Sequence, residues 1–103
     1  MDKKKLTRLQ QKHCSLYAKI GNIRERDLVG LAKKLGRRRS KGGKHPTYVS
    51  DHFPNARPIT IPSHRTLKVA TARSILDDLD GDIFRWQQYL DAQEAGESDE
   101  FDA

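Results

Sequence analysis

The sequence predicts one small α+β domain in which helices lie on one face of a small three-stranded antiparallel sheet. Three observations lead to this fold class. The chain has 103 residues, of which 35% are hydrophobic, enough for one domain with a compact core. Apolar residues recur with helical spacing towards both ends of the chain. Between these stretches, β-branched and aromatic residues form short runs bounded by glycine and proline.

Two helices are predicted in the first third of the chain. Over residues 6–20 the apolar side chains fall on one stripe, which indicates a leading helix that ends at Gly21. Asn22 offers an N-cap, so a second helix is expected over 23–35, with Gly36 as its stop. The apolar stripe of the leading helix has to be buried, either on the domain or against another copy of the chain.

Three short strands are predicted next. The basic segment 37–41 is followed by two glycines, and 45–50 then contains tyrosine and valine. The third strand, 57–61, carries strong β formers between Pro58 and Pro62, which confine it to a short length or an edge.

Helix returns at about residues 69–71, where apolar side chains resume a helical spacing. Gly81 is expected to interrupt this helix, so that Asp82 caps a separate final one. After Ala92 the composition becomes small and acidic, which is typical of disorder. The predicted order of elements is therefore α-α-β-β-β-α-α. The predicted organisation is an N-terminal helical extension over 1–21, a domain over 22–92 and an acidic, disordered tail over 93–103.

The charge is unevenly divided along the chain. Residues 1–50 hold 15 Lys and Arg against 3 Asp and Glu, whereas residues 51–103 hold 5 against 11. Such a division is typical of a protein that contacts a nucleic acid or another polyanion with one part of its surface.

Several classes of protein and site are excluded by simpler features. No apolar run approaches the roughly 18 residues of a membrane span, so we expect no membrane partner. The basic N-terminus lacks the apolar stretch of a secretory signal. Cys14 is the only cysteine, which excludes an intrachain disulfide and favours a reducing, cytoplasmic location. The histidines and Cys14 lack the spacing of zinc ligands, so we expect neither a metal nor another cofactor.

The most informative segment is 43–48, at the start of the second predicted strand. It resembles the glycine-x-histidine-x-x-aromatic signature of the HicA toxin family, small messenger-RNA interferases with a double-stranded-RNA-binding-like fold. Lys44 stands where the family usually has serine. The Ile-Thr-Ile-Pro sequence at 59–62 is similar to the end of a family strand, and Thr-Ala-Arg-Ser-Ile-Leu at 71–76 is similar to a family helix. The resemblance covers about residues 24–80.

This resemblance implies a function. The chain would be the toxin of a type II toxin–antitoxin system, a metal-independent endoribonuclease that cleaves messenger RNA and inhibits translation during stress. His45 would be its catalytic residue. A HicB-type antitoxin would be its partner and would block the active site.

The chemistry of the residues supports the same role. RNA is cut when its own 2′-hydroxyl attacks the adjacent phosphate, which requires proton transfer near neutral pH and positive charge at the phosphate. Histidine exchanges protons in this range, with an effect of roughly 10²–10⁴-fold, so His45 is the candidate general acid/base. Basic side chains would bind phosphates, a glycine lets the backbone approach one, and an aromatic ring stacks on bases. The candidate RNA-binding residues are Arg37, Arg38, Arg39, Lys41, Gly43, Lys44 and Tyr48.

Alternative interpretations remain open at this point. Tyr48 also suits packing within the sheet, and His52 and His64 are interpreted as loop residues, which leaves His45 without a second general acid. The same basic segment would serve a non-catalytic RNA-binding module of the double-stranded-RNA-binding type. A third hypothesis is a DNA-binding helix-turn-helix formed by the first two helices, which the short connection at Asn22-Ile23 permits.

Overall fold

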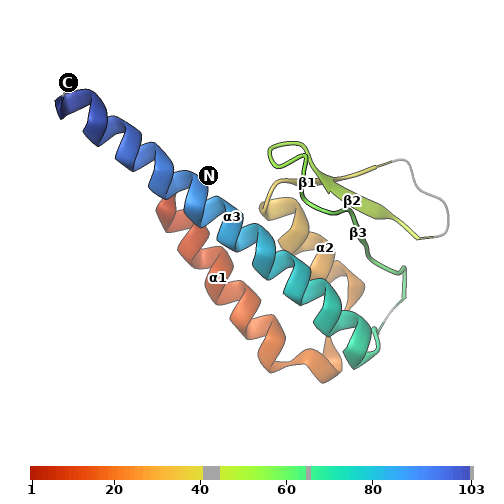
Figure 1. Cartoon of the computed structure of the whole chain (residues 1–103). Coiled ribbons are helices and arrows are strands. Elements are labelled where there is room, and N and C mark those ends of the chain that lie inside the picture. Colours follow the sequence, from red (N-terminus) through yellow and green to blue (C-terminus); the bar gives the residue numbers. More distant parts are fainter. Residues whose placement is uncertain (41–44, 65, 103) are drawn as a thin grey trace.

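Three helices and a three-stranded sheet form the protein (Figure 1). The computed structural model describes residues 1–40, 45–64 and 66–102, with side chains up to residue 96. The elements are α1 (Lys3–Ala18), a 3₁₀ turn over Ile20–Asn22, α2 (Glu25–Lys34), β1 (Arg37–Arg39), β2 (Thr47–Ser50), β3 (Ile59–Thr60) and α3 (Val69–Asp102). This α+β arrangement agrees in general kind with the predicted fold class. In the ranges described, no helix has both the length and the apolar character to cross a bilayer.

The leading helix α1 is part of the core. It runs alongside α3 in the opposite direction (Figure 1), and Leu6, Leu9 and Leu16 join the same buried cluster as the apolar side chains of α3. His13 lies on this face too, where its Nε2 is 2.7 Å from the carbonyl oxygen of Leu76 in a buried hydrogen bond. The apolar stripe of α1 is therefore covered by the domain itself.

The start of α2 differs from the prediction. The helix begins at Glu25, and at its N-terminus the backbone N–H of Arg24 donates to the Asp27 carboxylate at 3.1 Å. Asn22 belongs to the preceding 3₁₀ turn and does not cap α2. The capping contact is thus displaced by two residues from the predicted one, within the range over which helix ends are hard to assign.

The end of α2 matches the prediction. Gly36 adopts a left-handed conformation (φ +96°) directly after the helix, a geometry that favours glycine. The indole Nε1–H of Trp86 on α3 donates to the carbonyl oxygen of Leu35 at 2.8 Å, in a buried hydrogen bond. This bond fastens the end of α2, and hence the start of the sheet, to α3.

The sheet has the strand order β1-β2-β3, with both pairs antiparallel. Tyr48 on β2 is opposite Ile59 on β3, and both are buried towards the helices. Thr47 is opposite Thr60, with their hydroxyl oxygens 3.3 Å apart on the outer side. In β2 and β3 inward and outward side chains therefore alternate, as expected for a sheet covered on one face, whereas in β1 only Arg37 is buried and both Arg38 and Arg39 are exposed.

One continuous helix replaces the two predicted at the C-terminal end of the chain, because α3 runs through Gly81 without a break. A glycine within a helix costs about 1 kcal/mol relative to alanine, which the burial of Leu76, Leu79 and Ile83 on either side offsets. The guanidinium of Arg85 lies close over Gly81, where an added Cβ would be 3.3 Å from its Nη1. Glycine thus leaves room for a side chain of the next turn.

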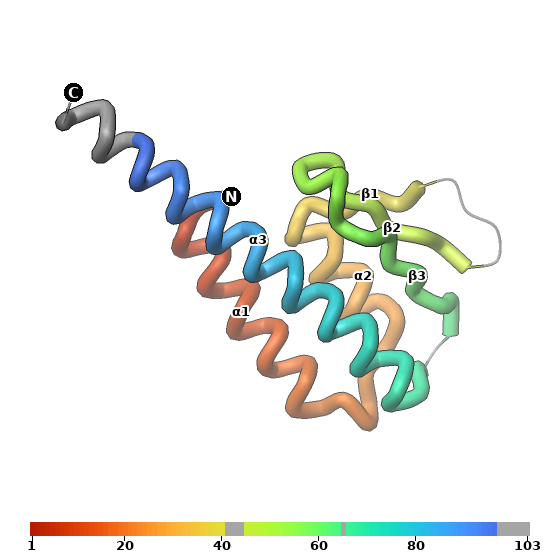
Figure 2. The backbone as a smooth tube through the Cα atoms, viewed as in Figure 1, coloured from red at the N-terminus to blue at the C-terminus, as the bar shows by residue number. Residues whose placement is uncertain are grey.

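The acidic tail, for which the sequence predicts disorder over 93–103, follows directly from α3. The bounds of α3 reach Asp102, and the coloured part of this helix already extends past the N-terminal end of α1 in Figure 2. The Lys3 ammonium lies 2.8 Å from Glu94 and 3.4 Å from Asp91, and the hydrogen bond with Glu94 raises the pKa of Lys3.

Candidate functional site

His45 stands at the start of β2, and its side chain is exposed. Directly after it, the carbonyl oxygen of Pro46 accepts a hydrogen bond from the Ile61 N–H at 3.1 Å. This bond extends the β2–β3 pairing beyond the strands, so the backbone next to His45 is fixed against the chain that leaves β3. Pro46 and Ile61 are both buried, and the site therefore rests on a rigid part of the sheet.

A second histidine faces His45. The His64 N–H donates to the Pro62 carbonyl oxygen at 2.9 Å, which closes a tight turn just after β3. This turn brings the His64 ring to 6.4 Å from the His45 ring, centroid to centroid, with the planes inclined by 62°. His64 is also exposed. Two solvent-accessible imidazoles thus lie side by side at one end of the sheet.

His64 lies in a loop, as predicted, but its proximity to His45 was not predicted. The observed register places Thr47 opposite Thr60, and continuing it places His45 opposite Pro62, two residues before His64. A register assigned from the alternation of buried residues would have brought the two histidines together. The two histidines are present in the sequence, but only the register of β2 against β3 shows that they lie close together.

A hollow of about 580 Å³ opens beside His64. Its walls come from the segment after β3 and the first turn of α3, and the residues that line it include Lys68, Thr66 and Thr71. The hollow therefore has one basic residue and two hydroxyl-bearing residues in the same wall as His64. These groups suit an anionic, oxygen-rich ligand such as a phosphate.

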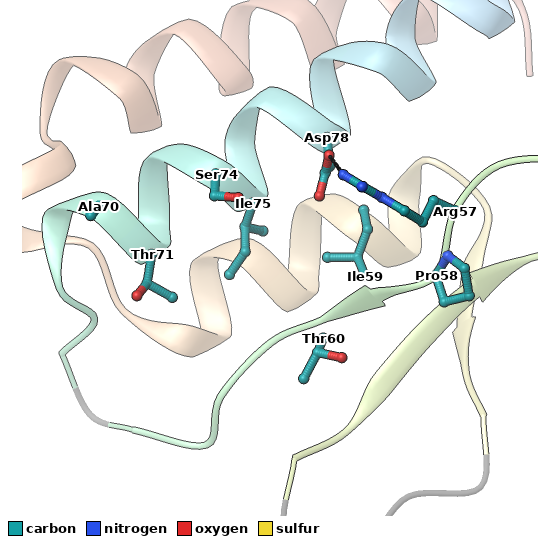
Figure 3. Close-up of a pocket in the computed structure, with 9 residues that line it drawn as sticks. All are labelled: Arg57, Pro58, Ile59, Thr60, Ala70, Thr71, Ser74, Ile75 and Asp78. Carbon is teal, nitrogen blue, oxygen red and sulfur yellow. Dashed lines mark hydrogen bonds and ion pairs between the residues drawn. The ribbon is translucent and has the colours of Figure 1, made fainter.

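A second hollow, of about 470 Å³, lies between β3 and α3 (Figure 3). It shares Thr71 with the first, so the two are adjacent along the start of α3. The Arg57 side chain reaches across it to Asp78 on α3, with Nη2 3.2 Å from the carboxylate oxygen (Figure 3). Together the hollows form a groove along the start of α3, with His64 at one end and the Arg57–Asp78 ion pair at the other.

The basic run before the site divides into two kinds of residue. Arg37 was predicted to bind RNA, and this prediction is wrong because its side chain is only 1% exposed. Its guanidinium makes a bidentate ion pair with Asp82 on α3, at 2.6 and 2.9 Å. Its Nη1–H also donates to the carbonyl oxygens of Tyr48 and Arg57. Arg37 therefore joins the sheet to α3 and is too deeply buried to contact a phosphate.

Arg38 and Arg39 do lie on the surface. The Arg38 guanidinium is 2.5 Å from the Asp51 carboxylate, and this hydrogen bond lowers the pKa of Asp51 and raises that of Arg38. Both side chains of the pair are more than half exposed, so the ion pair is open to exchange with another anion. The predicted contacts of Lys41, Gly43 and Lys44 fall on residues outside those that the structure describes.

Tyr48 belongs to the core, with 3% of its surface exposed. The prediction that it binds RNA is therefore wrong in this structure, and the packing alternative is correct. The side chain points from β2 towards the helices opposite Ile59. A ring in this position is held between sheet and helices and is not available to stack on a base.

A separate aromatic cluster lies at the far end of β2. The exposed His52 ring stacks on Trp86 with centroids 4.4 Å apart and planes 22° apart, and Phe53 and Tyr89 meet it edge-on. A four-residue strand separates His52 from His45, which places the two up to about 20 Å apart. His52 is thus held by packing at a distance from the paired histidines.

Neither a family model, nor a curated protein, nor a solved structure matches this chain.

Proposed function

We propose that the protein is an endoribonuclease of the HicA type, a messenger-RNA interferase of a toxin–antitoxin system with a double-stranded-RNA-binding-like fold, and that His45 acts in its proton transfer. The observation that supports this most directly is the exposed imidazole of His45 at the start of the central strand β2, next to His64 and to a groove lined by Lys68 and two threonines. An accessible histidine can exchange protons with a bound substrate, whereas a buried one cannot.

The charges around this site suit an RNA substrate. Arg38 and Arg39 are exposed on β1, and Lys68 lines the hollow beside His64. Phosphate contacts from such side chains position a nucleic acid on a protein without reading its sequence. The phosphate chain would then cross this end of the sheet and place one ribose at His45.

A partner is part of this proposal. An exposed basic site would be closed by an antitoxin of the HicB type, whose acidic surface would compete with RNA and associate quickly through electrostatic steering. The proposed setting is the bacterial or archaeal cytoplasm, where messenger RNA is present.

The test is cleavage of a mixed-sequence RNA by the purified protein, with a chelator present and with RNA binding measured in parallel. His45→Ala is expected to reduce cleavage by roughly 100-fold or more while RNA affinity changes little, because it removes proton transfer and leaves the arginine and lysine side chains in place. His52→Ala is the matched control, since it removes an exposed histidine at the other end of β2. It should cleave RNA like the wild type.

Two results would contradict the proposal. Unchanged cleavage in the His45→Ala variant would show that His45 takes no part in the reaction. RNA binding without any cleavage by the wild type would favour the non-catalytic RNA-binding module instead, for which the exposed arginines alone would suffice.

A further inference from the structure

We propose that His64 is the second proton-transfer group of this site, so that one imidazole of the His45–His64 pair acts as base and the other as acid. This inference rests on the proposed endoribonuclease function and extends it. The position of His64 opposite His45 supplies the general acid or base that a single histidine lacks.

The reaction needs two proton transfers at once. One neutral imidazole removes the proton of the ribose 2′-hydroxyl, and the 2′-oxygen then forms a bond to phosphorus. The bond from phosphorus to the 5′-oxygen breaks, and the other imidazole, in its protonated form, gives its proton to that oxygen. The products are a 2′,3′-cyclic phosphate and a free 5′-hydroxyl, and exchange of protons with water restores both rings. No metal or other reactant is required for this balance.

The distance between the rings suits this division of roles. Centroids 6.4 Å apart in an edge-on arrangement keep the two rings from stacking on each other. A phosphate held against both rings can come within about 3 Å of a nitrogen on each, the distance that proton transfer requires. The 2′-hydroxyl of the substrate can therefore lose its proton to one ring while the 5′-oxygen receives a proton from the other.

The chain around His64 is anchored on both sides. Ile61, three residues before it, is fully buried, and Leu67, three residues after it, is 4% exposed. The Leu67 N–H also donates to the carbonyl oxygen of Ile23 at 3.3 Å. Anchors this close limit how far the His64 backbone can move from His45, which is what a preorganised pair needs.

Charge near the pair favours the same step. Lys68 lines the hollow beside His64, where its ammonium would face a phosphate and stabilise the negative charge that develops on it. The other charged groups that line the groove are Arg57 and Asp78, which pair with each other one hollow further along α3. Among the described residues that line these hollows, Lys68 is thus the cation nearest His64 that is not paired with a carboxylate.

The experiment combines pH–rate profiles with a change of leaving group. Wild type, His45→Ala, His64→Ala and the control His52→Ala are assayed on a mixed-sequence RNA and on the 3′-(4-nitrophenyl) phosphates of the four ribonucleosides. The nitrophenolate leaves without a proton, so these esters need only the base. Thermal melts confirm that each variant is folded, as expected for substitutions at exposed positions.

We expect a bell-shaped profile for the wild type on RNA and roughly 100-fold or greater losses for both His45→Ala and His64→Ala, each with one limb of the bell removed. On the esters, one of these two variants should recover towards the wild-type rate and the other should not. The variant that recovers identifies the general acid. His52→Ala should keep the full bell on RNA.

The possible failures are distinguishable. If the wild type cleaves no RNA, the proposed function fails and the pair fails with it. If His45→Ala is inactive while His64→Ala keeps the wild-type rate and both limbs, the function stands and the role of His64 is refuted. Equal losses on RNA and on all four esters for both variants would likewise refute the division into acid and base.

Discussion

Arg37 and Arg38 are neighbours on β1 and identical in chemistry, yet they occupy opposite environments. The Arg37 side chain is 1% exposed and paired with a buried carboxylate on α3, whereas Arg38 is 60% exposed and paired with Asp51 on the surface. Alternation along a strand turns one towards the helices and the other towards solvent. A run of like charges therefore contains both a part of the core and a part of the candidate RNA-binding surface.

Arg37 and Asp82 belong to a buried hydrogen-bond network. Asp82 accepts from Arg37 through both oxygens and from Arg85 through one, and Arg37 donates in addition to two backbone carbonyls of the sheet. A buried ion pair of this kind adds little over apolar packing, but removing one partner leaves an uncompensated charge in the core. The network therefore specifies how the sheet sits on α3.

The largest expected effect comes from breaking this network. Asp82→Asn or Arg37→Ala should destabilise the fold by about 3–5 kcal/mol, because each leaves its partner buried and unpaired or underpaired. The measurement is the free energy of unfolding in urea. Asp80→Asn, an exposed carboxylate on the same helix, is the matched control and should change it by less than about 0.5 kcal/mol. A decrease below about 1 kcal/mol for both core variants would show that the ion pair does not hold the sheet.

A smaller effect, on binding and not on stability, is expected from the two exposed arginines of β1. If RNA lies across this surface, Arg38→Ala and Arg39→Ala should each weaken RNA binding. Each should also reduce the slope of log affinity against log salt by about 0.7 for every phosphate that the variant no longer neutralises. Stability should stay within about 0.5 kcal/mol of the wild type. Arg8→Ala on α1 removes the same charge elsewhere on the surface. An identical slope change for Arg8→Ala would mean that β1 does not bind RNA specifically.

Most helices and strands could be predicted from the sequence, whereas the packing between them could not. The leucine stripe of α2, the left-handed Gly36 and the three strands follow from local pattern, and the structure has each of them. Gly81 was misjudged because local propensity disfavours a helix there while packing on both sides favours it.

In the candidate site, too, local sequence pattern identified a residue but not its tertiary contacts. His45 was identified from its segment, but the burial of Arg37 depends on Asp82, which is 45 residues away, and the role proposed for His64 depends on strand register. Composition cannot separate Arg37 from Arg38, since both belong to one basic run. Only the pairing of β1 with β2 and the packing of α3 decide which one faces inward.

The smallest expected effect concerns the exposed pair itself. The hydrogen bond from Arg38 lowers the pKa of Asp51 in the folded state. The stability that this pair adds is therefore present above the unfolded carboxylate pKa of about 3.9 and is lost as the pH falls through the lower, folded value. Asp51→Asn should accordingly lower stability slightly at pH 7, and the difference from the wild type should vanish in strong acid.

The difference in stability between Asp51→Asn and the wild type should also shrink in about 1 M salt, because solvent ions screen an exposed pair and have little effect on a buried one. Measured by urea unfolding at several pH values, a difference that persisted at low pH or in high salt would place Arg38 with Arg37 as a structural arginine, and would remove it from the surface that we assign to RNA.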